Sequence, residues 1–446
     1  MRVLLATLPA TGHVNPMMAV AAALIEKHHD VVFVTGQQYA AEVSGLPVHF
    51  TALAYPQTAY ENIMASFSRP LPHFPRLLWD RPHAGFFSLL PEITSQLIQI
   101  IRQAQPDVIL ADYNFYAGAI AAEVCGIPYA TFCAIVNALP SKDTPAFGAR
   151  LDWKPPYHPE RVLWPFLRWG SRVYLSIDDR KVNHLRKFYG LPTVDFPTFG
   201  VTPYLFIVPT TEAYEYPRTD LPPQVVYVGP VLRQDTSENH FPWEWLEDQR
   251  PTLFVSMGTI VKVRRVFETV IQLAKNAPWK AVLAVGKGVA VDEFGSVPEN
   301  ILLQNFVPQR EILPKVDAVI SHGGNNTVTE TLFHGKPLII VPITGDQPES
   351  AGRIQHSGAG IRLRIQDINI NNLQKSIDKV LYEPRFRENA ARIQASYRAC
   401  DGPRTTVRLL EKLAACRVAL YRGDEMPPTL THPDEVDHLT PKLCCQ

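Results

Sequence analysis

Short apolar runs alternate with helical patterns along this chain, and the alternation occurs twice. The first half opens with RVLLATL (2–8), a helical pattern over 16–27 and a second apolar run, DVVFVTG (30–36). The second half repeats this order between TLFVSMG (252–258) and PLIIVP (337–342). Because strands that alternate with helices build parallel sheets covered on both faces, the pattern predicts two Rossmann-like parallel α/β domains. We expect the domains to face a cleft, with ligands at the carboxyl ends of the strands.

The remaining elements are expected to follow the same rhythm. Strands are predicted at 107–111, 129–132, 280–286, 300–306 and 317–324, and helices at 93–105, 115–124, 264–276, 326–334 and onward to about 416. Two stretches, 55–90 and 138–200, interrupt the rhythm because they are rich in proline and aromatic residues. The 40 prolines of the chain exceed the usual share of ~5%. We therefore predict long, ordered loops in these two stretches, placed over the carboxyl ends of the strands.

Length and turn composition suggest where the domains begin and end. A chain of 446 residues is too long for one compact domain. The segment 233–251 is polar and turn-rich and has no sheet pattern, so we place a linker there between domains at 1–232 and 252–421. The last residues, 422–446, are charged and contain proline, and we expect them to be poorly ordered. The opening MRVLLATLPA is predicted to be the first strand rather than a signal peptide, because a glycine turn and a helical pattern follow it.

Charge and cysteine content exclude several classes of partner. The formal net charge is zero and the pI is near 7.2, which argues against a nucleic acid or an anionic membrane bound through bulk charge. A local anion site is still compatible with this balance. The six cysteines have no metal-binding spacing and are expected to be reduced thiols of a cytoplasmic protein. No apolar run reaches the ~18 residues that a membrane span requires.

The stretch SHGGNNTVTE (321–330) lies where an apolar run should turn into a helix. Its two glycines allow the backbone to turn tightly and to approach a ligand closely. Asn325 and Asn326 are good N-caps, and Gly335 is suited to end the helix. Since a helix amino terminus presents N–H groups and partial positive charge, the stretch suits a phosphate. An ordinary strand–turn–helix connection, with His322 as a packed histidine, explains the same residues equally well.

Residues around this turn extend the site from a phosphate to a nucleotide sugar. Glu330 shares a helix face with Asn326, too far from the glycines to meet a phosphate, but its carboxylate can accept hydrogen bonds from a ribose diol. Phe306 could stack on a base, and the Gln309 amide could bind a base or ribose edge. Asp346 and Gln347 are expected to end the next strand and to offer polar groups to sugar hydroxyls.

Taken together, these segments resemble the nucleotide-sugar box of the family 1 glycosyltransferases, which are UDP-glycosyltransferase-like enzymes with the GT-B fold and include macrolide and other natural-product transferases. The matching motifs are FVPQ (306–309), HGGNNTVTE (322–330), GKPLIIVPITGDQ (335–347), GHVNP (12–16), VGPV (228–231) and VSMGT (255–259). The resemblance thus covers most of the chain. Gly323 and Asn325 stand where plant members carry Cys and Trp, so the sequence is more similar to microbial or fungal members.

The resemblance implies which residues hold the donor. They are Gly258, Thr259, Phe306, Val307, Gln309, His322, Gly324, Asn326, Thr327, Glu330, Asp346 and Gln347. Phe306 would stack on uracil and Glu330 would bind the ribose. Asp346 and Gln347 would hold the transferred sugar, while His322 and the helix start would hold the diphosphate. A glutamine at the end of the box favours UDP-glucose as co-substrate, although thymidine diphosphate stays open, and no cofactor is expected.

A histidine near the start of the chain is the candidate base. His13 lies in TGHVNP, in the first expected strand-to-helix loop, and Asp112 follows a strand at the same edge of the first sheet. A histidine can accept the proton of an attacking hydroxyl if a carboxylate fixes its tautomer. By themselves the two residues would more simply be a turn histidine and a helix N-cap, but the resemblance assigns them as the catalytic base and its partner. Without a covalent nucleophile, single displacement would invert the anomeric configuration.

The first domain is expected to bind the acceptor and the second the nucleotide sugar. Aromatic residues of the interrupting stretches are candidates for an apolar acceptor pocket: Tyr55, Phe67, Phe74, Trp79, Phe86, Phe87, Phe132 and Phe147. Any one of them would more simply be a packing residue, but as a group they predict a small lipophilic acceptor such as a phenolic or polyketide. No clustered carboxylates suggest a metal, so the leaving diphosphate would be stabilised by the helix terminus. We expect a monomer or a weak dimer.

Two other functions fit parts of the sequence. A nucleotide-sugar 2-epimerase can have the same fold, but it needs no apolar acceptor pocket and no base in the GHVNP loop. A catalytically silent protein could bind a nucleotide sugar without turning it over, but it would not need both His13 and Asp112. The leading prediction is therefore an inverting hexosyltransferase that uses a UDP-sugar.

Overall fold

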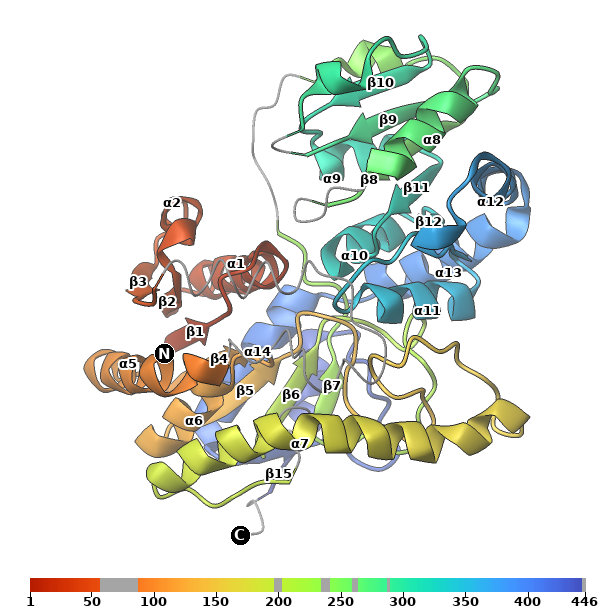
Figure 1. Ribbon diagram of the computed structural model, residues 1–446. Coiled ribbons are helices and arrows are strands. Elements are labelled where there is room, and N and C mark those ends of the chain that lie inside the picture. Colours follow the sequence, from red (N-terminus) through yellow and green to blue (C-terminus); the bar gives the residue numbers. More distant parts are fainter. Residues whose placement is uncertain (57–86, 196–202, 234–240, 259–263, 287–288, 443–446) are drawn as a thin grey trace. The chain divides into compact units, whose positions relative to one another are not determined.

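The computed structural model describes residues 1–446 apart from 57–86, 196–202, 234–240, 259–263, 287–288 and 443–446. The chain divides into two compact units (Figure 1). The first unit joins Met1–Arg233 with Ala399–Gln446, and the second comprises Gln234–Arg398. Each unit is built on its own parallel sheet, which confirms the prediction of two parallel α/β domains.

The first unit contains a seven-stranded parallel sheet in the order β3-β2-β1-β4-β5-β6-β7. Its strands are β1 Arg2–Ala6, β2 Asp30–Gly36, β3 His49–Leu53, β4 Val108–Asp112, β5 Tyr129–Phe132, β6 Leu205–Val208 and β7 Val225–Tyr227. Successive side chains of β1 point to opposite faces. Val3 and Leu5 therefore enter one buried core, while Leu4 and Ala6 enter the other.

Helices cover both faces of this sheet. They are α1 Thr11–Glu26, α2 Ala40–Val43, α5 Leu90–Ala104, α6 Tyr116–Cys125, α7 Trp164–Phe188 and α14 Gly402–Cys416. The apolar faces of α1 and α14 pack on the side of Val3, and those of α5 and α6 pack on the side of Leu4. Helix α5 illustrates the cause, because its buried residues Ile93, Leu97 and Ile101 recur every four positions and form one apolar stripe.

The carboxyl-terminal part of the chain differs from the expected boundaries. We predicted a second domain that extends to residue 421, but α14 belongs to the first unit and packs against α1. The tail after 421 is ordered as far as the structure describes it. It contains the 3₁₀ helix η8 Pro433–His438 and the strand β15 Thr440–Lys442, which pairs with β14 Ala419–Tyr421. Leu430, Val436 and Leu439 enter the core of the first unit, and composition alone did not reveal these anchors.

The second unit has a six-stranded parallel sheet in the order β10-β9-β8-β11-β12-β13. Its strands are β8 Thr252–Ser256, β9 Lys280–Ala284, β10 Ile301–Gln304, β11 Ala318–Ser321, β12 Leu338–Ile340 and β13 Gly360–Arg362. Its helices are α8 Arg264–Ala274, α9 Gln309–Ile312, α10 Asn325–Phe333, α11 Gln347–Ser357, α12 Ile370–Tyr382 and α13 Pro384–Arg398. Short 3₁₀ helices elsewhere in the two units are η1 Gln37–Tyr39, η3 Pro159–Leu163, η4 Trp243–Leu246, η5 Val291–Phe294, η6 Leu313–Lys315 and η7 Ile365–Asp367. Both sheets thus follow the strand order of dinucleotide-binding α/β folds.

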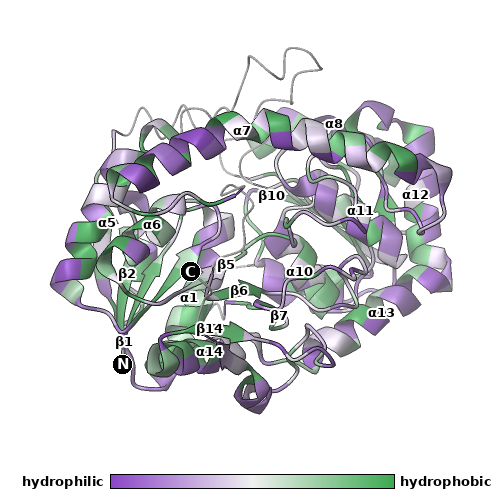
Figure 2. Ribbon diagram, turned by 90° about the horizontal axis from the view of Figure 1, so that it is seen from below, coloured by the Kyte–Doolittle hydropathy of each residue, from purple (hydrophilic) through white to green (hydrophobic). Residues whose placement is uncertain are grey.

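Helix α7 is the main element that the sequence did not predict. We expected loops over 138–200, whereas α7 is a helix of 25 residues (Figure 2). Its inward face consists of Trp164, Arg168, Ser171, Leu175, Asp178, Val182 and Leu185. Arg168, Ser171 and Asp178 interrupt the apolar residues of the inner face, while Phe166 and Trp169 lie on the outer face. Because apolar residues occur on both faces, the usual pattern of a surface helix is obscured and periodicity did not reveal α7.

Candidate functional site

The strand order of the first unit reverses between β1 and β4, because the chain runs outward to β3 and then returns to the other side of β1. Connections that leave such a pair of strands diverge, and ligands of α/β folds bind there. Asp112 is the last residue of β4. We expected His13 in a loop, but it lies in the first turn of α1, and Pro16 lies inside this helix. Proline is tolerated there because the missing bond would involve only the Gly12 carbonyl near the helix start.

His13 and Asp112 form the expected hydrogen bond. His13 Nδ1 lies 2.6 Å from Asp112 Oδ2. The Asp112 side chain is fully buried, whereas the His13 side chain is 16% exposed and can therefore be reached by a ligand. Because a carboxylate only accepts hydrogen bonds, Nδ1 carries the proton and Nε2 is the basic nitrogen.

Two further groups fix the Asp112 carboxylate. The Thr7 hydroxyl donates to Oδ2 at 3.0 Å, and the Asn114 backbone N–H donates to Oδ1 at 3.2 Å. Thr7 directly follows β1, next to the switch between β1 and β4. Sequence reasoning missed Thr7, although a polar residue at the carboxyl end of the first strand was the available signal. These bonds hold Asp112, and through it His13, in one orientation.

Tyr116 is a second titratable group near this pair. Burial raises its pKa strongly, and the charges of Asp178, Asp179 and Asp112 raise it further. The phenol therefore stays protonated across the physiological range. Its ring stacks on Phe87, with ring centroids 5.5 Å apart.

In the second unit the strand order reverses between β8 and β11, at the position that corresponds to β1 and β4. Gly258 follows β8, and His322 to Gly324 follow β11. The His322 ring packs against both glycines. A Cβ atom would lie 2.7 Å from His322 Cε1 if added at Gly258, and 2.6 Å from Nε2 if added at Gly324. Gly258 also has a φ of +75°, so it needs glycine for two reasons.

His322 is neutral near pH 7. Burial lowers its pKa to about 4, although a hydrogen bond with the Ser256 backbone acts in the opposite direction. It can therefore contribute a hydrogen bond to an anion, but not a full positive charge. The positive potential at this turn comes from backbone N–H groups instead.

Helix α10 begins one residue earlier than we expected. Its N-cap is Gly324, not Asn325 or Asn326, and glycine has no side chain to cap the first turn. The amino terminus of a helix presents backbone N–H groups and partial positive charge, which suit an anion. The helix ends at Phe333, and the predicted stop at Gly335 is confirmed by a left-handed φ of +65°.

Glu330 is the centre of a polar cluster on α10. Its Oε2 accepts a hydrogen bond of 2.5 Å from Gln309 Nε2, and its Oε1 accepts one of 2.9 Å from Arg310 Nε. The Gln309 amide also lies 3.4 Å from the Thr327 hydroxyl. Arg310 was not predicted, even though it directly follows the FVPQ motif. A carboxylate has about four lone-pair sites, so these two bonds still leave acceptor capacity for a diol.

The residues expected for the transferred sugar lie at the start of α11, not at the end of a strand. Asp346 is the N-cap, and Gln347 is the first helical residue. Gln347 Oε1 accepts hydrogen bonds from the backbone N–H groups of Ile343 and Thr344, at 2.9 and 3.0 Å. The Gln347 side chain therefore has its amide N–H groups left to offer to a sugar hydroxyl.

Phe306 and Val307 are both predicted to bind the donor, but one lies at the surface and the other in the core. Phe306 follows β10 and is 58% exposed, so its ring is accessible for stacking. Val307 is buried and its side chain packs in the interior, and its contact with the donor stays a prediction. Asn326 lies in the first turn of α10. Thr259 lies outside the described residues.

The four described acceptor aromatics belong to three different apolar clusters. Phe132 is fully buried within the sheet core, so it is a packing residue and not an accessible pocket wall. Phe87 is buried against Tyr116. Tyr55 donates a hydrogen bond to Gln38 at 3.1 Å, and Phe147 is half-buried. Four predicted members lie outside the described residues: Phe67, Phe74, Trp79 and Phe86.

Comparisons with known proteins find one family model and relatives along most of the chain. Residues 280–413 match the C-terminal domain family described as erythromycin biosynthesis protein CIII-like. The chain is similar to 4'-demethylrebeccamycin synthase of Lentzea aerocolonigenes, with 29% identity over 439 residues, which cover 92% of this chain and 99% of the relative. It is also similar to demethyllactenocin mycarosyltransferase of Streptomyces fradiae, with 27% identity over 418 residues, which cover 91% and 85%.

A solved structure shows the same fold. It is the glycotransferase of kitacinnamycin, which matches with a TM-score of 0.72 and 20% identity over 92% of this chain and 98% of that chain. At this identity the match concerns the fold alone. With two parallel α/β sheets, a family match in the second half and relatives along nearly the whole length, the chain has the GT-B fold and is similar to glycosyltransferases.

Proposed function

We propose that the protein is an inverting glycosyltransferase that moves a hexose, with glucose favoured, from a UDP-sugar to a hydroxyl group of a small lipophilic acceptor. The observation that carries this proposal is the hydrogen bond between His13 and the buried Asp112, at the switch point of the first sheet. A surface histidine with an incidental partner would not need a carboxylate held by both Thr7 and Asn114.

The reaction is a single displacement. The acceptor oxygen attacks the anomeric carbon, and its proton moves to His13 Nε2. The bond between that carbon and the diphosphate oxygen breaks, and the nucleoside diphosphate leaves with the electron pair. Asp112 stabilises the imidazolium that forms. Because attack and departure occur on opposite faces of the sugar, the product has the inverted configuration.

The residues that we propose to bind the donor belong to the second unit. The amino terminus of α10 and the neutral His322 would bind the diphosphate. Glu330, oriented by Gln309 and Arg310, would accept hydrogen bonds from the ribose hydroxyls. The exposed Phe306 ring would stack on the base.

The sugar and the acceptor complete the proposal. The Gln347 amide and Asp346 at the start of α11 would hold the hexose hydroxyls. The relatives are named for 4'-demethylrebeccamycin and demethyllactenocin, and these names support a natural product as the acceptor class. We therefore place the acceptor among phenolic, polyketide and related compounds.

Release of UDP tests the proposal directly. We would incubate the full chain with UDP-glucose, or with TDP-glucose, and a panel of flavonoids, phenols and macrolides, in EDTA. His13→Ala should abolish acceptor-dependent release. His49→Ala is the matched control, because His49 also contacts a carboxylate, Asp30 at 3.2 Å, but its side chain is 73% exposed. Undiminished activity of His13→Ala would reject the base assignment, and conversion of the donor to its epimer without acceptor would favour the 2-epimerase.

A further inference from the structure

Helix α7 and the turn before it expose a row of large apolar side chains. Val162, Phe166, Trp169, Val173 and Ile177 are 70%, 69%, 68%, 46% and 44% exposed. They recur every three or four residues, so they form one stripe on the outer face. At 1.5 Å per residue the stripe is about 24 Å long. Soluble proteins rarely leave a continuous apolar surface of this kind without a partner.

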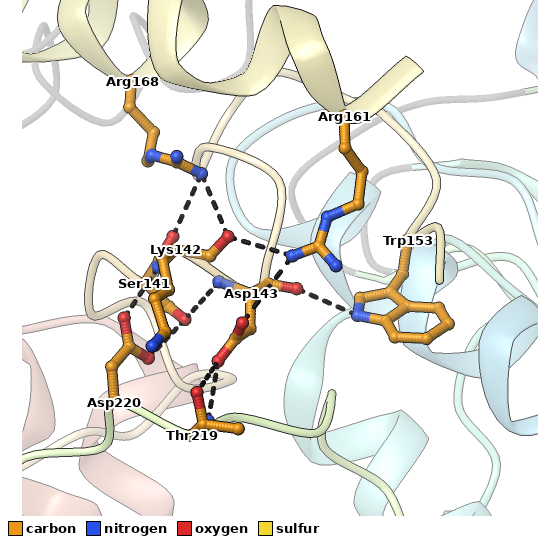
Figure 3. A network of polar contacts seen from close by, with 8 residues as sticks. All are labelled: Ser141, Lys142, Asp143, Trp153, Arg161, Arg168, Thr219 and Asp220. Atoms are coloured by element: carbon orange, nitrogen blue, oxygen red, sulfur yellow. Dashed lines mark hydrogen bonds and ion pairs between the residues drawn. The ribbon is translucent and has the colours of Figure 1, made fainter. Parts of the chain in front are cut away.

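The orientation of this stripe is fixed at the amino-terminal end of α7 by a polar network (Figure 3). Arg161 donates to the Lys142 carbonyl at 3.0 Å, and Arg168 donates to the Ser141 carbonyl at 3.3 Å. The loop that carries these carbonyls is itself held, because Ser141 donates to Asp220 at 2.6 Å and Thr219 donates to Asp143 at 2.7 Å. The Arg161 guanidinium also lies over the buried Trp164 ring, 4.5 Å from its centroid.

The carboxyl-terminal end of α7 is fixed as firmly. Arg186 forms a bidentate ion pair with Glu123 of α6, at 2.9 and 2.7 Å. Val182 and Leu185 enter the core formed with α5 and α6. Since both ends are anchored through the inner face, the helix cannot turn its apolar stripe inward without breaking these contacts.

Charge distinguishes the outer face from an ordinary hydrophobic patch. Residues 161–188 are all described, and their only acidic residues, Asp178 and Asp179, are buried. Arg180, Lys181 and Lys187 are exposed. Neither Arg180 nor Lys187 forms an ion pair with any described carboxylate. The outer face therefore combines apolar and cationic side chains and lacks exposed acids.

We propose that this outer face of α7 docks the protein on an anionic lipid bilayer. A helix with exposed Trp, Phe and Val beside Arg and Lys is suited to lie in the interface between headgroups and acyl chains. A second copy would bring two cationic faces together, which opposes pairing. No helix in the described part of the chain is long and apolar enough to cross a membrane, so the attachment is peripheral.

The docking surface does not depend on the proposed reaction, but it would bring the enzyme close to a lipophilic acceptor. A lipophilic acceptor partitions into bilayers, so an enzyme bound at the surface meets it at a raised local concentration. Activity toward a water-soluble phenolic acceptor should be independent of α7. Loss of docking and loss of catalysis are therefore separate outcomes.

Sedimentation with lipid vesicles tests the proposal on the full chain. Vesicles of phosphatidylcholine with phosphatidylglycerol should bind the protein, and vesicles of phosphatidylcholine alone should bind it more weakly. The double variant F166S/W169S should bind at least about tenfold more weakly. The charge reversal R180E/K187E should lose about tenfold on the anionic vesicles only. All variants should keep the turnover of a water-soluble acceptor, which also shows that they fold.

Matched controls come from α12, which also exposes apolar and basic residues. Ile370 and Tyr382 are 41% and 52% exposed, so their replacement is matched to the changes in α7. I370S/Y382S and K375E/K379E should bind vesicles as the wild type does, because α12 is not part of the proposed docking surface. Brominated lipids should quench tryptophan fluorescence in the wild type and much less in Trp169→Phe. The proposal is overturned if the wild type ignores anionic vesicles or if the α7 variants bind unchanged. Self-association that F166S/W169S abolishes, without vesicle binding, would instead identify an interface between copies.

Discussion

The two units use the same position of the same fold in different ways. In each sheet the strand order reverses beside the first strand, and the candidate site lies beyond that reversal. In the first unit the site is made of side chains, with His13 bonded to a buried Asp112. In the second unit the turn at that reversal is built from glycines, with Gly258 and Gly324 packed on the His322 ring at a helix start. The position therefore suits proton transfer when side chains fill it, and anion binding when glycines leave the backbone accessible.

The largest effect is expected from a change that keeps the shape of the first site and removes its charge. Asp112→Asn should lower kcat by about 10³ to 10⁴, because an amide can hold the wrong tautomer of His13 and cannot stabilise the imidazolium. The KM for UDP-sugar should hardly change, since the residues that we propose to bind the donor belong to the other unit. Steady-state kinetics measure both constants, and Thr7→Val should show a smaller loss of the same kind. A comparable loss in donor affinity would contradict the separation of roles.

The second unit should instead be sensitive to added atoms. Gly258→Ala should weaken UDP binding by about 3 kcal/mol, because a Cβ collides with the His322 ring and the residue has a positive φ. Gly295→Ala is the control for strain alone, since Gly295 has a φ of +66° and nothing within 4 Å of its Cβ. Calorimetric titration of UDP gives the comparison. A G258A/H322A variant that binds UDP little more weakly than His322→Ala alone would support the collision, and equal losses at Gly258 and Gly295 would refute it.

Acid should destabilise the second site through His322. Its folded pKa of about 4 lies below the ordinary value of 6.5, so the unfolded chain binds the proton more readily. The stability that comes from the neutral ring is present above pH 6.5 and is lost as the pH falls toward 4. We expect the free energy of unfolding to fall by about 2 kcal/mol over this range, after allowance for the partial exposure of the ring. Urea titrations at a series of pH values give the free energy of unfolding. It should depend less on pH for His322→Asn than for the wild type, whereas His438→Asn, at an exposed histidine, should leave the pH dependence unchanged.

The smallest effect concerns Arg310, one of the two residues that sequence reasoning missed. Arg310→Met should raise the KM for UDP-sugar about fivefold with little change in kcat, because Glu330 loses the partner that orients it. Arg385→Met is the matched control, since Arg385 pairs with Glu383 at an exposed site. The affinity for 2′-deoxy-UDP should fall less than that for UDP, because the lost orientation concerns the ribose hydroxyls. Equal losses would place Arg310 elsewhere in the mechanism.

Sequence reasoning predicted the elements that depend on local pattern. The strand at 129–132 has the predicted bounds, and Gly335 ends α10 because glycine readily adopts a left-handed conformation. It could also place His13 and Asp112 at one sheet edge, because parallel strands bring their carboxyl ends together. It did not reveal Thr7 or Arg310, whose roles depend on contacts made across the sheet and between helices.

Other features were hidden because tertiary contacts decide them. The α7 pattern is mixed, with Arg168 and Asp178 inward and Phe166 outward, so its periodicity does not point clearly to a core. Phe132 and Val307 belong to predicted sites but are buried. An apolar residue can line a binding pocket or fill the hydrophobic core, and only the tertiary packing distinguishes the two.

The position of α14 has a consequence for the synthesis of the protein. The chain leaves the first unit after Arg233 and returns at Ala399, so the second unit is an insertion within the first. Leu409, Leu410 and Leu413 of α14 pack in the same core as β1 and α1. The amino-terminal half is made first but remains without this cover until the final part of the chain emerges from the ribosome. The second unit, whose residues are contiguous, can fold earlier, and a nascent chain stalled near residue 398 should expose the bare apolar face of α1 to chaperones.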